Sequence, residues 1–125
     1  MAEGFLISYD PTLEVFSAGT NPAARVHPKA IAVMKEVGID ISHSSPKSVD
    51  QFIHQSFDYV ITVCDHAKET CPAFVGGVEH RLHVGFDDPV EAAGTEQEIL
   101  DTFRRVRDEI RERFNRFYLD HLKAP

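Results

Sequence analysis

The chain has 125 residues and a mass of 14.1 kDa, which is the usual size of one domain with its own hydrophobic core. Its composition, 42% hydrophobic and 26% charged, is that of a globular protein and excludes collagen-like, coiled-coil and disordered classes. The net charge of -7 opposes binding to nucleic acid or to an anionic membrane, because Lys and Arg supply most of that attraction. We therefore expect one domain, residues 1–125, whose ligand is a small molecule or a protein.

The expected cellular location rests on the lack of membrane and export signals. The longest apolar stretch is about as long as residues 59–64, far short of the ~20 residues that cross a bilayer. Glu3 stands near the start and no basic patch precedes an apolar region, so no secretory signal is predicted. We expect a cytoplasmic protein whose two cysteines are reduced thiols.

The first half of the chain predicts helices and one strand. Residues 1–9 have the apolar spacing of a helix, but no N-cap residue precedes them. Residues 13–18 alternate as a strand that ends at a glycine. Residues 28–37 form an amphipathic helix with proline in its first turn and glycine just after it. A serine should cap a short helix over residues 48–52.

The second half predicts two strands and two helices. Residues 59–64 form a nearly continuous β-branched run, typical of a strand buried on both faces of a parallel sheet. Residues 65–71 read as a short helix and residues 81–84 as a weaker strand. A capping box, Thr95 and Glu98, should open a long helix. Its apolar stripe consists of Ile99, Phe103, Val106, Ile110, Phe114 and Phe117. Strands that alternate with helices indicate an α/β domain with an open, mostly parallel sheet.

Two cysteines stand where an open α/β sheet places its ligands. Cys64 ends the central strand, and the carboxyl edge of such a sheet is the usual binding site. The plainer interpretation is a buried apolar cysteine. If residues 65–71 are helical, the α-carbons of Cys64 and Cys71 lie about 10 Å apart, whereas a disulfide needs less than ~7 Å. A bridge between them would therefore require unwinding, which makes it a conformational switch.

A metal site is the alternative use of these thiols. Cys64, His66 and Cys71, with His80 or His83, form a mixed Cys/His set, but their spacing matches neither zinc-finger nor zinc-ribbon patterns. The sequence favours a dithiol over a metal site, and we expect no metal and no organic cofactor.

The remaining polar groups divide between the site and the surface. Asp88 follows a strand end, where a carboxylate serves as a general acid or simply belongs to an Asp-rich turn. The arginine-rich face of the last helix is expected to be a solvated face with ion pairs and no chemistry. Surface positions are expected for His27, His43, His54 and His121.

The sequence as a whole resembles a known family. The segments Phe-Ser-Ala-Gly-Thr, Val-Ile-Thr-Val-Cys-Asp, Glu-Thr-Cys-Pro and Gly-Phe-Asp-Asp-Pro occur in the order found in thioredoxin-coupled arsenate reductases. These proteins belong with the low-molecular-weight tyrosine phosphatases. The resemblance implies a three-layer fold, with an open, mostly parallel sheet flanked by helices.

The resemblance also implies a thiol relay. In the family, a loop cysteine attacks arsenate, a second cysteine releases arsenite, and a third closes a disulfide that thioredoxin reduces. Cys64 matches the second cysteine, Cys71 the third, and Asp88 the general acid. Glu3 and Ser17 match positions that support a potassium site in some members, while Lys47 replaces an acid, so its ammonium is expected to take the ion's place.

One family motif has no counterpart in these residues. The family begins with a strand and a Cys-x5-Arg loop that binds the oxyanion, but the residue six after Cys64 is Thr70 and six after Cys71 is Gly77. The chain is therefore expected to lack the first strand and to be inactive alone in arsenate reduction and phosphatase chemistry.

Two expectations depend on that missing strand. Without it, residues 13–18 and 59–64 would pair directly, exchange strands in a dimer, or leave a marginal monomer. The function would be arsenate reduction when the loop is supplied. The alternatives are a non-catalytic dithiol redox switch or a module that binds arsenite through two soft thiolates.

Overall fold

The computed structural model describes residues 1–19, 26–63, 76–87, 89 and 92–123. The chain divides into two units. The first consists of Met1–Phe16, Val26–Ser44 and Asp88–Pro125, and the second of Ser17–Arg25 and Ser45–Asp87. Across the described ranges, none of the helices has the length and apolar character needed to span a membrane.

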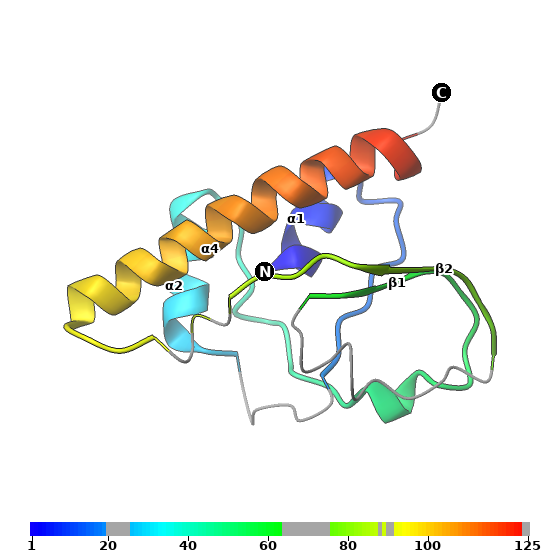
Figure 1. The fold of residues 1–125 in the computed structure, drawn as a ribbon, viewed down its shortest axis with the longest axis horizontal. Coiled ribbons are helices and arrows are strands. Elements are labelled where there is room, and N and C mark those ends of the chain that lie inside the picture. Colours follow the sequence, from blue (N-terminus) through cyan, green and yellow to red (C-terminus); the bar gives the residue numbers. More distant parts are fainter. Residues whose placement is uncertain (20–25, 64–75, 88, 90–91, 124–125) are drawn as a thin grey trace. The chain divides into compact units, whose positions relative to one another are not determined.

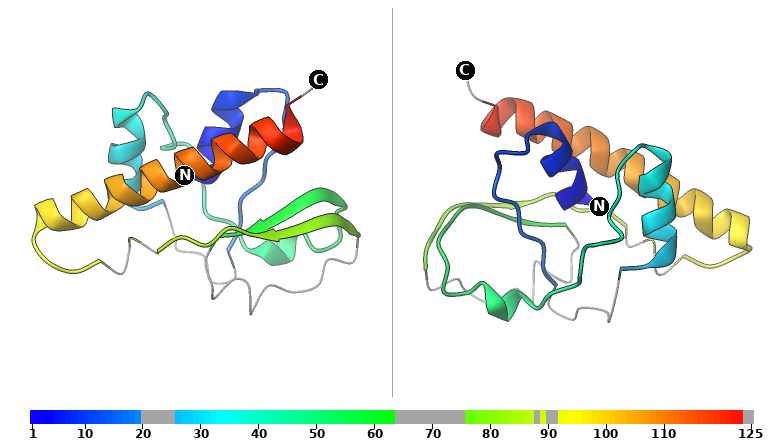
Figure 2. Two further views of the ribbon diagram at one scale, coloured as in Figure 1. Left: turned by 45° about the horizontal axis from the view of Figure 1, so that its top comes forward. Right: turned by 180° about the vertical axis from the view of Figure 1, so that it is seen from behind.

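The first unit is built from helices (Figure 1). They are α1 (Ala2–Tyr9), α2 (Pro28–Glu36) and α4 (Glu96–Phe117), which continues into a π-helical turn, η3 (Tyr118–Leu122). Both α1 and α2 pack against α4, and the views in Figure 2 agree with this arrangement. The long helix is therefore the element on which the two shorter ones are assembled.

The apolar stripe of α4 provides the core of this unit. Thr95 caps the helix by accepting a hydrogen bond from the backbone N–H of Glu98 at 3.1 Å, as the capping-box pattern predicts. The fully buried side chains are Phe5 on α1, Met34 and Val33 on α2, and Phe103 and Val106 on α4. Burying each large apolar side chain contributes about 1.5–3 kcal/mol to stability. The packing of these side chains is therefore the main source of stability of the unit.

Helix α1 lacks a side-chain cap, as the sequence indicates, and is held by its other end. The hydroxyl of Tyr9 donates to the carbonyl of Arg111 at 2.9 Å, and the hydroxyl of Tyr118 donates to Asp10 at 3.3 Å. The two tyrosine rings lie 5.9 Å apart. Tertiary contacts thus replace the missing local cap.

Helix α2 begins at a histidine that the sequence places on the surface. The Nδ1 atom of His27 accepts a hydrogen bond from the backbone N–H of Lys29 at 3.1 Å, and the imidazole ring lies 4.9 Å from the ring of Phe103. His27 is therefore a half-buried N-cap, an exception to the expectation that most of these histidines lie at the surface. The helix ends at Glu36, one residue earlier than predicted, and Gly38, whose φ of +81° suits glycine, follows the C-cap residue Val37.

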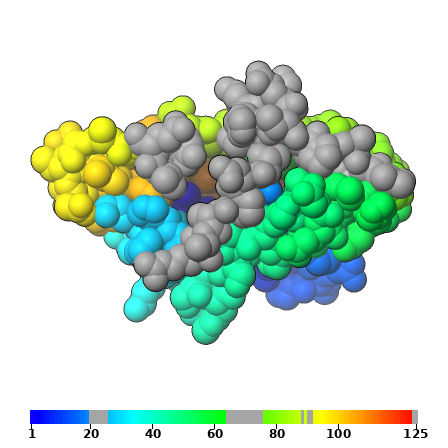
Figure 3. All heavy atoms as spheres, turned by 90° about the horizontal axis from the view of Figure 1, so that it is seen from below, coloured from blue at the N-terminus to red at the C-terminus, as the bar shows by residue number. Residues whose placement is uncertain are grey.

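The second unit contains a parallel strand pair. Strand β1 (Phe57–Thr62) pairs with β2 (Val78–His83), with Tyr59 opposite His80 and Thr62 opposite His83. Ser48 caps a short 3-10 helix, η1 (Val49–Gln51), through the N–H of Asp50. Figure 3, which shows the molecule from below, has the green atoms of the segment around η1 at its surface.

Parallel strands and helices confirm the predicted α/β class, but two details of the prediction fail. Residues 13–18 form no strand within the described part of the chain, and the β-bridge from Gly19 to Ser48 begins just after this segment. Alternation alone supplies no ladder partner, and a strand exists only with one. Strand β1 is half-buried rather than buried on both faces, and β2 is its one ladder partner among the described strands. The helix predicted over residues 65–71 lies outside the described residues. That the chain forms a single domain stays a prediction.

Gly76 offers a test of the loop that leads into β2. A Cβ atom at this position would lie 2.6 Å from the carbonyl oxygen of His54 and would also meet the backbone of Gln55. We expect Gly76→Ala to lower the free energy of unfolding by about 2 kcal/mol, because backbone cannot yield as a side chain does. Gly77→Ala is the matched control: its Cβ meets open space, and its φ of +95° alone should cost about 1 kcal/mol. Urea unfolding of both variants measures the difference, and an equal loss would contradict the close approach.

Candidate active site

The carboxyl ends of β1 and β2 form the candidate site of the second unit. The carbonyl of Thr62 accepts a hydrogen bond from the N–H of Val84, and the carbonyl of Val63 accepts one from the N–H of Phe86, each at 2.9 Å. The hydroxyl of Thr62 and the Nδ1 atom of His83 are 2.7 Å apart. Pairing therefore continues past the last residues of both strands.

The three predicted catalytic residues follow this edge in the sequence. Cys64 comes directly after Val63, and Asp88 comes two residues after Phe86. Cys64, Cys71 and Asp88 themselves lie outside the described residues. What the structure does describe is the strand ends that precede Cys64 and Asp88.

The residues predicted to support an ion site belong to different units. Glu3 lies in the first turn of α1, whereas Ser17 and Lys47 belong to the second unit. There, the N–H of Gly19 donates to the carbonyl of Lys47 at 2.9 Å, so the segment containing Ser17 runs beside that containing Lys47. The ammonium of Lys47 donates to the carbonyl of Ser45 at 3.3 Å. This local contact does not test the substitution of an ion by Lys47, which stays a prediction.

The described residues provide no support for the alternative of a metal site. His80 stacks on Tyr59 with ring centroids 4.9 Å apart, and His83 bonds to Thr62. Within the described ranges, no group of three His, Cys, Asp or Glu side chains is arranged to hold a metal ion. The other proposed ligands, Cys64, His66 and Cys71, fall outside those ranges.

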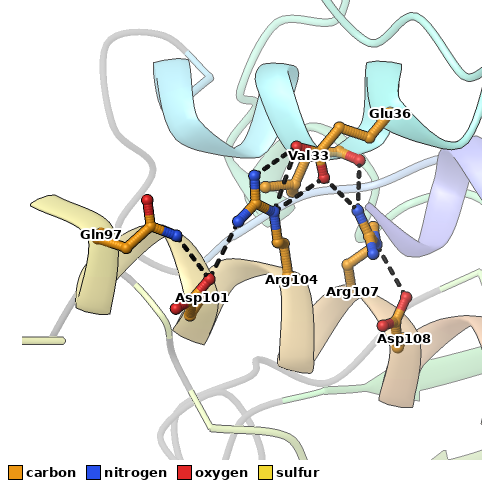
Figure 4. Close-up of polar contacts among 7 residues, drawn as sticks. All are labelled: Val33, Glu36, Gln97, Asp101, Arg104, Arg107 and Asp108. Atoms are coloured by element: carbon orange, nitrogen blue, oxygen red, sulfur yellow. Dashed lines mark hydrogen bonds and ion pairs between the residues drawn. The ribbon is translucent and has the colours of Figure 1, made fainter.

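A network of ion pairs joins the end of α2 to α4 (Figure 4), whereas the sequence predicted only a solvated face with ion pairs along the last helix. Two nitrogens of Arg104 reach the carboxylate of Glu36, the closer at 2.8 Å, and the guanidinium of Arg107 reaches Glu36 at 2.8 Å and Asp108 at 2.9 Å. Arg107 is 9% exposed, so the predicted solvated face is wrong at this residue. The partner of Arg105, Glu109, lies one turn away at 2.7 Å, as expected.

The charges in this network shift one another's titration. Hydrogen bonds from Arg104, and then from Arg107, lower the pKa of Glu36 to about 2. The hydrogen bond to Asp108 is the largest cause that raises the pKa of Arg107. The network is thus a structural tie in the helical unit.

A parallel strand pair together with helices defines the class as an α/β protein, and the two cysteines and the acid that follow the strand ends in the sequence remain its predicted site. Comparison with known proteins makes the class more specific. The family model for low molecular weight phosphotyrosine protein phosphatase matches residues 1–124. The chain belongs to this family.

Several relatives are named arsenate reductase. The protein of Halalkalibacterium halodurans is 47% identical over 118 residues, which are 94% of this chain and 84% of that protein. The protein of Bacillus subtilis is 44% identical with the same coverage. The fold is similar to a solved structure of an arsenate reductase in the phosphate binding state, with a TM-score of 0.77 and 32% identity over 95% of this chain and 86% of that one. A structure of an arsenate reductase in the oxidized state gives 0.75 and 31% with the same coverage.

Proposed function

We propose that the chain performs the thiol-relay steps of an arsenate reductase. The observation that carries this proposal is the identity of 47% to a protein named arsenate reductase, together with the paired strand ends that precede Cys64 and Asp88. A cysteine after a parallel strand stands at the edge where α/β proteins bind ligands. The proposed location is the cytoplasm, where thiols are kept reduced.

The proposed chemistry transfers two electrons from two thiols to arsenic. The thiolate of Cys64 attacks the sulfur of an arsenylated cysteine held by a Cys-x5-Arg loop. The electrons of the broken sulfur–arsenic bond stay on arsenic, which leaves as arsenite. Cys71 then attacks the Cys64 sulfur, closes the Cys64–Cys71 disulfide and releases the loop thiolate. Asp88 supplies the proton to the leaving oxygen in the first step, and thioredoxin reduces the final disulfide.

The proposed chemistry requires a loop thiol that these 125 residues do not contain. The 125 residues contain two cysteines, and neither begins a Cys-x5-Arg motif. We expect a polypeptide of these residues alone to show no arsenate-dependent turnover of thioredoxin, because the first nucleophile and its arginine are missing. A version with an in-frame Cys-x5-Arg segment ahead of residue 1 should be active.

Single turnover distinguishes the two cysteines in that longer version. We expect Cys71→Ser to release one equivalent of arsenite per chain and then stop, because the first disulfide forms but cannot pass to Cys71. Cys64→Ser should release none, and Asp88→Asn should slow the first step by about 100-fold or more. Measuring the arsenite that each variant releases after rapid mixing, with and without thioredoxin, distinguishes these outcomes. Sustained turnover by Cys71→Ser would contradict the relay.

A dithiol redox switch is the second candidate, since it needs only Cys64 and Cys71, the two cysteines of these residues. A switch would close the Cys64–Cys71 disulfide reversibly without arsenate, and thioredoxin would reopen it. Thiol titration before and after mild oxidation tests this on the chain itself. If the longer version is inactive while the disulfide cycles, the switch replaces the enzyme as the function.

A further inference from the structure

The N-terminus of α2 is capped by a side chain that can take up a proton near neutral pH. Pro28 has no backbone N–H, so the first free donor of the helix is the N–H of Lys29, and the Nδ1 atom of His27 accepts from it at 3.1 Å. When Nδ1 accepts, the neutral ring carries its proton on Nε2. Among the described helices, the other side-chain caps are the hydroxyls of Ser48 and Thr95, which do not titrate in this range. The cap of α2 alone depends on the protonation state of an imidazole.

The surroundings of this imidazole disfavour a proton on Nδ1. Such a proton would point at the N–H of Lys29, so two donors would face each other. It would also add a positive charge at the end of α2 where the helix dipole is already positive. The half-buried ring lies 4.9 Å from the ring of Phe103, whose face attracts a cation only weakly.

The charged groups on the two helices around this contact are engaged with other partners. They are Lys29, paired with Glu96; Glu36, paired with Arg104 and Arg107; Asp101 and Asp108, paired with these two arginines; Lys35, whose charge acts on Asp40; and Glu98, which lies over Gly94. None of these carboxylates forms an ion pair with His27. An imidazolium at this position would therefore lose the cap bond without gaining an ion pair from them.

We propose that His27 is a proton switch for α2, in which the neutral imidazole caps the helix and the imidazolium releases its first turn. The capped helix needs the neutral ring and the open turn does not, so the open form takes up the proton more readily and opening becomes easier as pH falls. Histidine ordinarily changes its charge between pH 5 and 8. The released turn contains Ala30 and precedes Val33 and Met34, which are buried. The proton switch lies wholly in the helical unit and requires neither cysteine.

Amide hydrogen exchange at equivalent positions of two helices tests the proton switch on the 125-residue chain. The N–H of Ile31 donates to the carbonyl of His27 at 3.2 Å in α2, and the N–H of Ile99 donates to the carbonyl of Thr95 at 2.9 Å in α4. Protection is the intrinsic exchange rate at each pH divided by the measured rate. From pH 8 to pH 5, we expect the protection of Ile31 to fall roughly five- to tenfold, through the lost cap and the added charge, and that of Ile99 to change less than about twofold.

Substitutions at His27 separate the effect of the proton from that of the cap. His27→Asn keeps an acceptor that does not titrate, so the protection of Ile31 should stay high at both pH values. His27→Ala removes the acceptor, so protection should be low at both. His43→Asn removes an exposed histidine of the same unit and should retain the wild-type response.

The outcomes that overturn the proton switch are distinct. It fails if Ile31 and Ile99 lose protection equally in the wild type, or if His27→Asn retains the fall at Ile31. Unchanged protection of Ile31 in His27→Ala would show that the cap does not hold the first turn. Imidazole nitrogen chemical shifts give an independent measurement: at pH 8 the proton of His27 should be on Nε2, and a proton on Nδ1 would contradict the cap.

Discussion

Replacing Phe103 with alanine is expected to lower the free energy of unfolding by about 4 kcal/mol, the largest effect on stability anticipated for a single substitution in this chain. The side chain is 1% exposed and lies on the face of α4 that packs against α2. The Phe103 ring also packs against the imidazole of His27, the N-cap residue of α2. Its removal therefore loses both buried apolar area and the contact that holds this cap residue. Urea unfolding followed by circular dichroism measures the change.

The same substitution at an exposed phenylalanine provides the control. Phe16 is 51% exposed, and Phe16→Ala should cost less than about 2 kcal/mol, in proportion to the smaller buried area. A comparable loss at both positions would mean that the stripe of α4 is not the core of the helical unit. The slope of the unfolding curve should stay unchanged in both variants, because neither alters the size of the folded unit.

Features predicted from the sequence are those whose partners are a few residues away. Thr95 finds its partner at Glu98, Ser48 at Asp50, and Gly38 provides the backbone conformation that ends α2. Each depends on a spacing that can be read along the chain. The parallel strands were likewise found from composition, although β1 and β2 begin earlier than residues 59 and 81.

Features that the sequence did not predict depend on a partner from another segment. His27 reads as a surface histidine until Phe103 is placed against it, and Arg107 reads as one of several helix arginines until Glu36 is placed opposite. The Thr62–His83 pair was missed for the same reason, since β1 and β2 had no register. One signal was available: both residues close their strands, and parallel strands meet at one edge.

The contact of Arg107 with α2 is expected to contribute nearly as much to the free energy of unfolding as the Phe103 side chain. One guanidinium nitrogen donates to the carbonyl of Val33 at 3.0 Å, one of the last four carbonyls of α2, which have no partner within the helix. Arg107→Met keeps most of the volume but leaves this carbonyl and Glu36 without that donor, so we expect a loss of about 3 kcal/mol. A double-mutant cycle with Glu36→Gln should show coupling, measured by urea unfolding, and strictly additive losses would contradict the network.

The same network predicts how stability falls in acid. The arginines lower the pKa of Glu36 from the usual 4.5 to about 2 in the folded chain, so the unfolded chain takes up the proton first as pH falls. The stability that Glu36 contributes is complete above pH 4.5 and is lost between pH 4.5 and about 2. The difference in unfolding free energy between wild type and Glu36→Gln should therefore be constant above pH 5 and shrink below it. Glu112→Gln makes the same change of net charge on an exposed turn of α4 and serves as the control. If the two variants give parallel curves, net charge alone governs the acid response and the ion pairs of Glu36 do not.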